Sequence, residues 1–305
     1  MFTTAAMDDK PVSWIARPAG RRLAYAEYGA PDGRPVFYCH GFPSSHREAL
    51  LFHETAVAAG VRLIAPDRPG YGASTPDPRR QIADWSADVA ALAAALDLTR
   101  FDVIGVSGGT PYALACAHGL PEQVRACVLV GPLGPVYLRS VLDEMHWGAW
   151  LNLALARYAP RLAHALYGGP VPGLLARWPM LVERMRTFNT PPSDHAVLTG
   201  DTLAVLNRTI VDAMCQGARG ARRDLLLYTQ DWQLPYDRIA TPTTIWHGLA
   251  DGTVPASHAG WYAAHLPRAT LHLVPEHGHY SLPVRLAGDI LASLGARPAE
   301  LDSSI

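Results

Sequence analysis

The sequence predicts an α/β protein in which a mainly parallel β-sheet is covered by helices on both faces. Short apolar segments, which we interpret as buried strands, alternate with helical segments along most of the chain. These strand segments are continuously apolar, which is typical of parallel strands buried on both faces. The chain has 305 residues, 49% hydrophobic and 17% charged, enough for one large domain with an insertion or for two small domains.

The first half of the chain contains the expected opening strands, at 21–28 and 36–39. The turn between them, Pro31-Asp32-Gly33, is made of residue types that favour turns. A helical stretch at 47–59 precedes a buried apolar strand at 61–65. The Ala/Leu-rich helix expected at 84–96 is followed by a strand at 101–106 and a helix at 110–118.

The second half of the chain contains three further apolar strands, expected at 124–130, 243–246 and 269–274. Between residues 133 and 237 the sequence shows only helical patterns broken by proline and glycine. We therefore expect a core formed by 1–132 and 238–305, with a helical lid at 133–237 inserted between two core strands. An independent second domain is the alternative, but both flanks of the insertion belong to the same sheet.

The motif Gly105-Val106-Ser107-Gly108-Gly109 lies between the expected strand at 101–106 and the helix at 110–118. A G-x-S-x-G motif in this setting predicts a nucleophile elbow, a strained turn that presents the serine hydroxyl above the sheet. The flanking glycines let strand and helix approach without a Cβ clash. The following helix directs its free N–H groups towards the serine. An ordinary glycine-rich turn is the alternative interpretation.

A serine hydroxyl needs a general base, normally a histidine that is oriented by a carboxylate. Asp251 and His279 follow Ser107 in the order typical of elbow-containing hydrolases, each just after an expected strand. Asp251 has an alternative role as a cap for the helix expected at Pro255. His277 is the alternative base. The two histidines also raise the possibility of a metal, but no carboxylate cluster or H-x-H-x-D pattern completes a ligand shell, so we expect none.

An oxyanion hole in such a site requires two N–H donors. One is expected from Gly108, directly after the serine, and the other from the loop His40-Gly41-Phe42-Pro43-Ser44-Ser45. Phe42 is the expected donor in this loop, because Gly41 permits an unusual backbone angle and Pro43 stiffens the turn beyond it.

On these motifs the chain resembles the α/β-hydrolase superfamily over residues 20 to 295. The resemblance implies the α/β-hydrolase fold with a Ser-His-Asp triad formed by Ser107, His279 and Asp251. Its dehalogenases and epoxide hydrolases place Asp where this chain has Ser107. The matching motifs are His40-Gly41-Phe42-Pro43, Asp67-Arg68-Pro69-Gly70-Tyr71-Gly72, the elbow, the acid loop from Gly248 to Pro255, and Gly278-His279.

The resemblance implies a serine esterase that cleaves a carboxylic ester or lactone through an acyl-enzyme, without a cofactor. A narrower likeness, to bacterial esterases that include serine-dependent macrolide esterases, suggests a bulky apolar or macrolide-type substrate. A C–C bond hydrolase, a peptidase and a non-catalytic ligand receptor are the alternatives. A dinucleotide-binding protein is not expected, because G-x-G-x-x-G follows none of the strands.

The expected lid carries four of the eight tryptophans of the chain. Such side chains above a polar triad would suit a bulky apolar substrate, although they could equally pack the lid helices together. We therefore take as candidate substrate-binding residues His40, Trp147, Trp150, Trp178 and Trp232.

Composition limits the partners and the location of the protein. The net charge is −1 with no basic stripe, which argues against a nucleic-acid partner. No apolar run reaches membrane-spanning length and the N-terminal segment has no signal-peptide core, so we expect a cytoplasmic protein acting on a small molecule. The four cysteines contain no C-x-x-C pair, which indicates reduced thiols in a reducing compartment.

Overall fold

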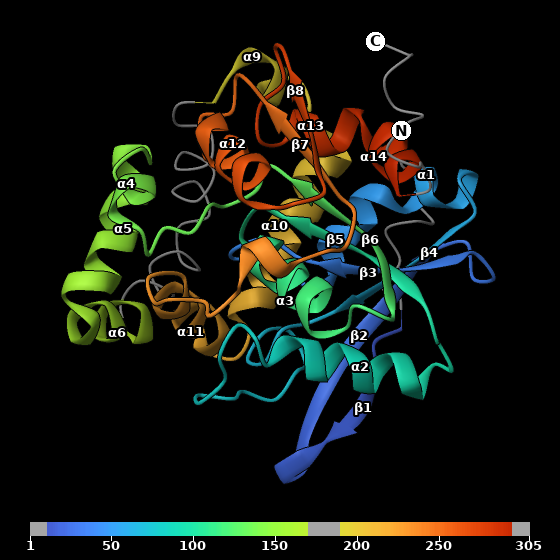
Figure 1. The fold of residues 1–305 in the computed structure, drawn as a ribbon. Helices are drawn as coiled ribbons and strands as arrows, with labels where there is room; N and C mark the ends of the chain where they lie inside the picture. The colour runs from blue at the N-terminus through green and yellow to red at the C-terminus, as the bar shows by residue number, and fades with distance from the viewer. Residues whose placement is uncertain (1–10, 170–189, 295–305) are drawn as a thin grey trace.

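A central β-sheet with helices on both faces organises the molecule (Figure 1). The computed structural model describes residues 11–169 and 190–294. The sheet has eight strands in the order β1-β2-β4-β3-β5-β6-β7-β8. Pairing is parallel from β4 through β8, whereas β2 is antiparallel to both β1 and β4. The strands are Ser13–Arg17 (β1), Arg21–Gly29 (β2), Arg34–Cys39 (β3), Val61–Pro66 (β4), Phe101–Val106 (β5), Val124–Val130 (β6), Thr243–Gly248 (β7) and Ala269–Val274 (β8).

The fold class and the strands expected from the sequence are confirmed, with one strand missed. All six residues of β5 and all six of β7 are buried, which explains why these strands are mostly apolar or small, with Asp102 in β5 and His247 in β7 as the exceptions. The missed strand is β1, an edge strand whose residues are mostly exposed. An exposed edge strand needs no apolar run, so the pattern used to predict the other strands is absent from β1.

Alternate residues of each strand enter two separate hydrophobic layers, one on each face of the sheet. Phe37 belongs to the layer beneath α2, α3 and α12, whereas Val36 and Tyr38 belong to the opposite layer beneath η3, α1, α10, α13 and α14. These helices are Trp85–Ala95 (α2), Thr110–Gly119 (α3), Ala256–His265 (α12), His46–Phe52 (η3), His53–Ala58 (α1), Gly200–Met214 (α10), Ser281–Arg285 (α13) and Ala287–Ser293 (α14).

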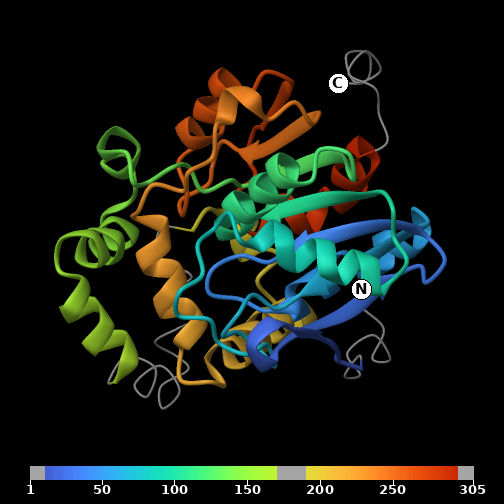
Figure 2. The same cartoon turned by 60° about the horizontal axis from the view of Figure 1, so that its bottom comes forward.

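The segment between β6 and β7 contains helices joined by loops, and no strand, in its described residues 133–169 and 190–237. Figure 2 shows α4, α5 and α6 at one side of the molecule, with α11 beside α5 and α6, whereas α10 packs against η3 of the core. No helix in the described ranges is long and apolar enough to cross a membrane. The segment contains Arg139–Leu142 (α4), Trp147–Tyr158 (α5), Pro160–Gly168 (α6), Pro192–His195 (α9), Gly200–Met214 (α10), Arg219–Tyr228 (α11) and Tyr236–Arg238 (η5).

A fully buried ion pair joins this helical segment to the core. Arg68, just after β4, donates from Nε to Asp224 Oδ2 of α11 at 2.8 Å. The same guanidinium donates to the carbonyl oxygens of His40 and Gly41. Its five N–H donors can therefore hold a loop of the core and a helix of the insertion at the same time.

The carboxylate of Asp224 is saturated by further donors. The hydroxyls of Tyr71 and Tyr112 donate to it at 2.8 and 2.5 Å, and Arg80 forms a second ion pair with it. Burial alone would raise the pKa of Asp224, but the Arg80 and Arg68 guanidinium groups hold it well below its usual range. Asp224 is therefore ionised, and its charge is neutralised inside the protein.

We predict that Asp224→Asn lowers the free energy of unfolding by about 3–5 kcal/mol, because it leaves buried arginine charge uncompensated. Chemical denaturation measures the change. Asp143→Asn is the control, since Asp143 forms only exposed contacts, a pair with Arg139 and a hydrogen bond from the Trp150 indole N–H. Exposed pairs of this kind contribute about 0.5 kcal/mol or less. An Asp224→Asn protein no less stable than the control would contradict the structural role of this pair.

Candidate active site

Ser107 occupies a strained turn directly after β5. Its φ is +51°, in the left-handed region that residues with a Cβ seldom adopt. The 3-10 turn Ser107–Gly109 (η4) begins at this residue and continues into α3. The turn places the hydroxyl at the carboxyl edge of the sheet, where β3, β7 and β8 also end.

Close packing around this turn requires both flanking glycines. A Cβ on Gly105 would lie 2.7 Å from the Ala113 Cβ, and one on Gly109 would lie 2.0 Å from the carbonyl oxygen of Cys39. The G-x-S-x-G pattern is thus a steric requirement of the strand-to-helix junction.

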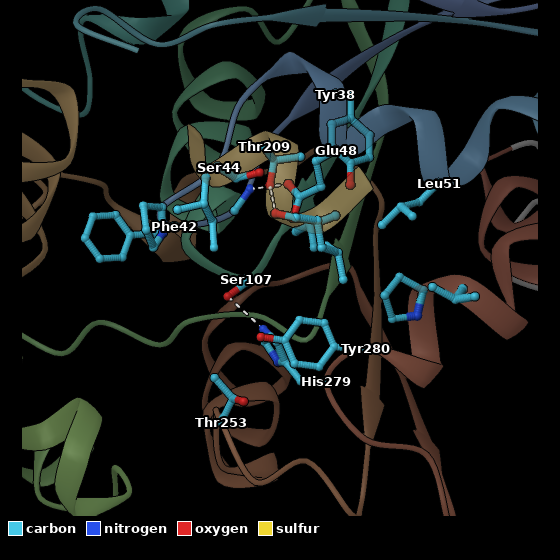
Figure 3. A pocket seen from close by; sticks show the side chains of 17 residues that line it. Tyr38, Phe42, Ser44, Glu48, Leu51, Ser107, Thr209, Thr253, His279 and Tyr280 are labelled. Carbon is cyan, nitrogen blue, oxygen red and sulfur yellow. Dashed lines mark hydrogen bonds between the residues drawn. The ribbon is translucent and has the colours of Figure 1, made fainter. Parts of the chain in front are cut away.

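His279 lies between Ser107 and Asp251 and contacts both. Its Nε2 is 3.1 Å from Ser107 Oγ, and its Nδ1 is 2.7 Å from Asp251 Oδ2 (Figure 3 shows the serine contact). Because Nδ1–H donates to the carboxylate, the neutral ring keeps a lone pair at Nε2 that accepts the serine hydroxyl proton. The sequence thus identified three residues that the structure brings together.

Asp251 is fixed by its own loop. Its Oδ1 accepts the backbone N–H groups of Thr253 and Val254 at 2.8 and 2.9 Å, which leaves Oδ2 facing His279. The helix α12 begins at Ala256 with Pro255 as its N-cap residue and has no side-chain cap. Asp251 therefore does not cap that helix, which was the alternative role considered from the sequence.

His277 contacts neighbouring backbone groups instead of the serine. Its Nδ1–H donates to the Pro275 carbonyl at 3.0 Å, and its own carbonyl accepts the Ala250 N–H. His277, the alternative base, is therefore not part of the hydrogen-bonded series Asp251–His279–Ser107. In the described ranges, no group of three or more His, Cys, Asp or Glu side chains is arranged to hold a metal ion.

The pKa shifts of the acid and the base have opposite directions. Burial raises the pKa of Asp251, but the neighbouring His279 outweighs it and lowers the net value. Burial lowers the pKa of His279, but the Asp251 charge and hydrogen bond raise the net value. Each group therefore stabilises the charged form of the other, which suits a histidine that must hold a proton transiently.

Asp194 of α9 supports the histidine loop, and sequence reasoning missed it. This buried carboxylate accepts the backbone N–H groups of Tyr280 and Ser281 at 3.1 and 2.7 Å. These partners are 86 and 87 residues away in the sequence, and no motif marks Asp194 itself, so only the fold reveals the contact.

Phe42 and Gly108 lie side by side next to Ser107. A Cβ on Gly108 would be 2.6 Å from the Phe42 Cβ and 2.7 Å from the Tyr228 hydroxyl. That hydroxyl donates to the Gly108 carbonyl at 2.8 Å. The residues expected to form the oxyanion hole are therefore adjacent, and the hydrogen bond from Tyr228 of α11 holds Gly108 in place.

His40 has a structural position and does not line the cavity. Its side chain is completely buried, with Nδ1–H donating to the Gly41 carbonyl at 3.0 Å. Burial and the nearby Arg68 lower the pKa of His40 to about 3, so the ring is neutral at physiological pH. His40 supports the loop that carries Phe42.

Three of the tryptophans named from the sequence, Trp147, Trp150 and Trp232, do not line the cavity beside Ser107. Trp147 and Trp150 lie on α5 and are 63% and 36% exposed. Trp232 is buried, and its indole N–H donates to the Tyr228 carbonyl at 3.2 Å. Trp178 lies outside the described residues. The composition of the segment could not indicate which helix faces the cavity.

A cavity of about 130 Å³ opens beside Ser107 and His279. Its walls come from the loop after β3, from η3, from α10 and from α13 (Figure 3). Most of the lining is apolar, and Glu48, Ser44 and Thr209 add polar groups at one end. The apolar lining residues include Leu51, Leu206, Ile210, Pro283 and Val284.

Comparison with known proteins relates this arrangement to a family. Residues 34–286 match the family model described as alpha/beta hydrolase fold. A non-heme chloroperoxidase of Streptomyces lividans is 38% identical over 126 residues, which cover 40% of this chain and 45% of that protein. The match thus spans less than half of the length of the chloroperoxidase. A pimeloyl-[acyl-carrier protein] methyl ester esterase of Nitrosomonas europaea is 29% identical over 246 residues, covering 76% of this chain and 88% of the esterase.

Solved structures show the same architecture. An alpha/beta hydrolase fold protein from Nakamurella multipartita superposes with a TM-score of 0.63 and 25% identity, covering 94% of this chain and 100% of that chain.

We predict that the pKa of His279 lies above the ordinary histidine value of about 6.5 and falls in Asp251→Asn. The charge of Asp251 raises the pKa of His279. Without that charge, burial of the imidazole dominates and lowers the pKa. NMR titration of labelled histidine measures the shift, with His279→Gln assigning the resonance. Asp143→Asn, a surface change, should leave the titration unaltered. An unchanged His279 pKa in Asp251→Asn would refute the coupling.

Proposed function

The chain belongs to the α/β-hydrolase family, and from this premise we propose that it is a serine hydrolase that cleaves a carboxylic ester or lactone. The observation that carries the proposal is the hydrogen-bonded line from Asp251 through His279 to Ser107. It joins a nucleophile, a general base and an orienting carboxylate in the order that acyl transfer requires.

In the proposed acylation step, Ser107 Oγ attacks the carbonyl carbon while His279 Nε2 takes the hydroxyl proton. Asp251 stabilises the imidazolium that forms. The backbone N–H groups of Phe42 and Gly108 donate to the oxyanion of the tetrahedral intermediate. His279 then returns the proton to the leaving oxygen as the ester C–O bond breaks.

In the proposed deacylation step, a water molecule attacks the acyl-enzyme and His279 removes its proton. The second tetrahedral intermediate collapses, the carboxylic acid is released and Ser107 regains its proton. The scheme uses only these side chains, the two backbone donors and water, and it needs no cofactor.

We further propose that residues 133–237 form a lid over a core made of 1–132 and 238–305. Three contacts support this assignment. The helix α10 contributes Leu206 and Ile210 to the cavity wall. Asp194 holds the histidine loop, and Tyr228 holds the residue after the nucleophile.

The size of the cavity bears on the substrate. A volume of about 130 Å³ suits a compact group on one side of the scissile bond. A bulky apolar or macrolide-type portion would then lie outside this cavity, towards the helices of the proposed lid. Trp147 and Trp150 would contact such a portion only if the lid moved relative to its position in the structure.

The cysteines support a proposed cytoplasmic location. All four are free thiols, and Cys39, Cys116 and Cys127 are buried in the core. Free thiols persist in reducing compartments.

We predict that Ser107→Ala lowers ester hydrolysis by a factor on the order of 10⁴ to 10⁶, because triad members act as a unit. Release of p-nitrophenol from acetyl to decanoyl esters measures the loss. Ser257→Ala, the same change on the surface of α12, should keep parental activity. Activity of Ser107→Ala within tenfold of the parent would overturn the assignment.

Lactones and prolyl p-nitroanilide extend this panel. Faster cleavage of the anilide than of every ester would favour a peptidase instead. Binding of esters without turnover by the parent protein would favour a ligand receptor.

A further inference from the structure

Glu48 is a carboxyl group inside the cavity that the proposed reaction does not use. It lies on η3, and its side chain lines the cavity together with Ser107 and His279. One oxygen, Oε2, accepts the Gly41 backbone N–H at 2.5 Å. Within residues 11–169 and 190–294, Glu48 forms no ion pair, in contrast to Asp224 and Asp251. It is thus a carboxyl group at the cavity wall without a counter-ion.

The surroundings of Glu48 only partly compensate its charge. Burial raises the pKa of Glu48 to about 7, although the Gly41 N–H, Arg68, His279 and the Ser44 hydroxyl all act to lower it. A desolvated carboxylate is unfavourable unless a cation or several donors accompany it. The cavity therefore offers a binding position for a group that supplies positive charge.

Hydroxyl groups surround the same end of the cavity. Tyr38, Ser44 and Thr209 reach it from β3, the following loop and α10, on the side away from His279 (Figure 3). The Tyr38 hydroxyl is buried and has no hydrogen-bond partner among the described residues. Burial raises the pKa of this phenol, and the negative charge of Glu48 raises it further.

The rest of this end is apolar. Leu51, Leu206 and Ile210 form walls against which methylene groups can pack. A carboxyl group, an unpaired hydroxyl and aliphatic walls together match an alkylammonium group, whose N–H bonds donate to oxygen and whose stem is apolar. A neutral hydroxyl would satisfy the hydrogen bonds but would leave the carboxylate charge unpaired.

We propose that this end of the cavity binds a compact ammonium group of the substrate, with Glu48 as its counter-ion. The inference rests on the proposed function, since Ser107 must cleave the molecule whose ammonium group Glu48 holds. Glu48 is then a residue that determines specificity: it selects esters with a protonated amine near the scissile bond over esters with an apolar group of the same size.

The test compares methyl esters of ω-amino acids of two to six carbons with neutral isosteres in which methyl replaces ammonium. Methanol release, corrected for the spontaneous rate, gives kcat/KM for each ester. The measured quantity is the ratio of the ammonium ester to its isostere. A general loss of activity cancels in this ratio, so damage to the fold or the triad does not mimic the effect.

We predict that the parent protein prefers at least one ammonium ester, and that Glu48→Gln lowers the ratio tenfold or more. The amide keeps an oxygen that can accept the Gly41 N–H, so this substitution removes the charge and retains the backbone contact. Glu54→Gln on the exposed start of α1 is the matched control and should leave the ratio unchanged. A ratio equally unaffected by both substitutions would overturn the proposal.

The pH dependence gives a second readout. Only ionised Glu48 attracts the cation, so the parental ratio should rise with pH through about 7 and become flat in Glu48→Gln. Arg68 remains charged in this range, Tyr38 remains neutral, and titration of His279 affects both esters alike. The profile is read on the esters of four to six carbons, whose amines are far enough from the ester to stay protonated through this range. A parental ratio independent of pH would contradict the role of Glu48.

Two outcomes separate this inference from the proposed function. If the parent hydrolyses the neutral isosteres but shows no preference for any ammonium ester, the ammonium subsite is wrong and the hydrolase stands. If it hydrolyses neither series, calorimetry with n-butylammonium chloride on the parent and Glu48→Gln decides. Binding that is weakened tenfold or more by the substitution supports the subsite even though the reaction is wrong, and equal or absent binding overturns it.

Discussion

Arg68 and Asp224 pair in the fully buried space between the core and α11, 156 residues apart in the sequence. Placing two charges there is unfavourable unless all their hydrogen-bonding capacity is used. The guanidinium meets this demand through the carbonyls of His40 and Gly41, and the carboxylate through Arg80 and two tyrosines. The loop that carries Phe42 and the helix that carries Tyr228 are consequently fixed relative to each other, on either side of Ser107.

Three carboxyl groups near the proposed site differ because their partners differ. Asp224 faces two guanidinium groups and Asp251 faces His279, and the pKa of each is lowered despite burial. Glu48 has one backbone N–H and no ion pair, and its pKa is raised to about 7. The first serves structure and the second is proposed to serve catalysis. The third has unused capacity for a ligand, which is why we assign it to binding.

The sequence predicted those features of the structure that short sequence patterns determine. Continuous apolar runs predicted the parallel strands, and the residue types around Ser107, Asp251 and His279 identified groups that the structure brings together. The exposed edge strand β1 gave no such signal. Asp194 and Asp224 belong to contacts between distant helices and loops, so no motif reveals them. Aromatic content did not specify which helix lines the cavity beside Ser107, whose lining includes none of Trp147, Trp150 and Trp232.

The central claim, that Ser107 is the nucleophile of a hydrolase, is tested most directly by reaction with diethyl p-nitrophenyl phosphate followed by peptide mass spectrometry. The account predicts one diethylphosphoryl group per chain, attached to Ser107, with loss of ester hydrolysis in proportion to labelling. The triad activates this hydroxyl above the other serines of the chain. Attachment to a different residue with the same loss of activity, or an unlabelled Ser107 in a fully inactivated protein, would contradict it.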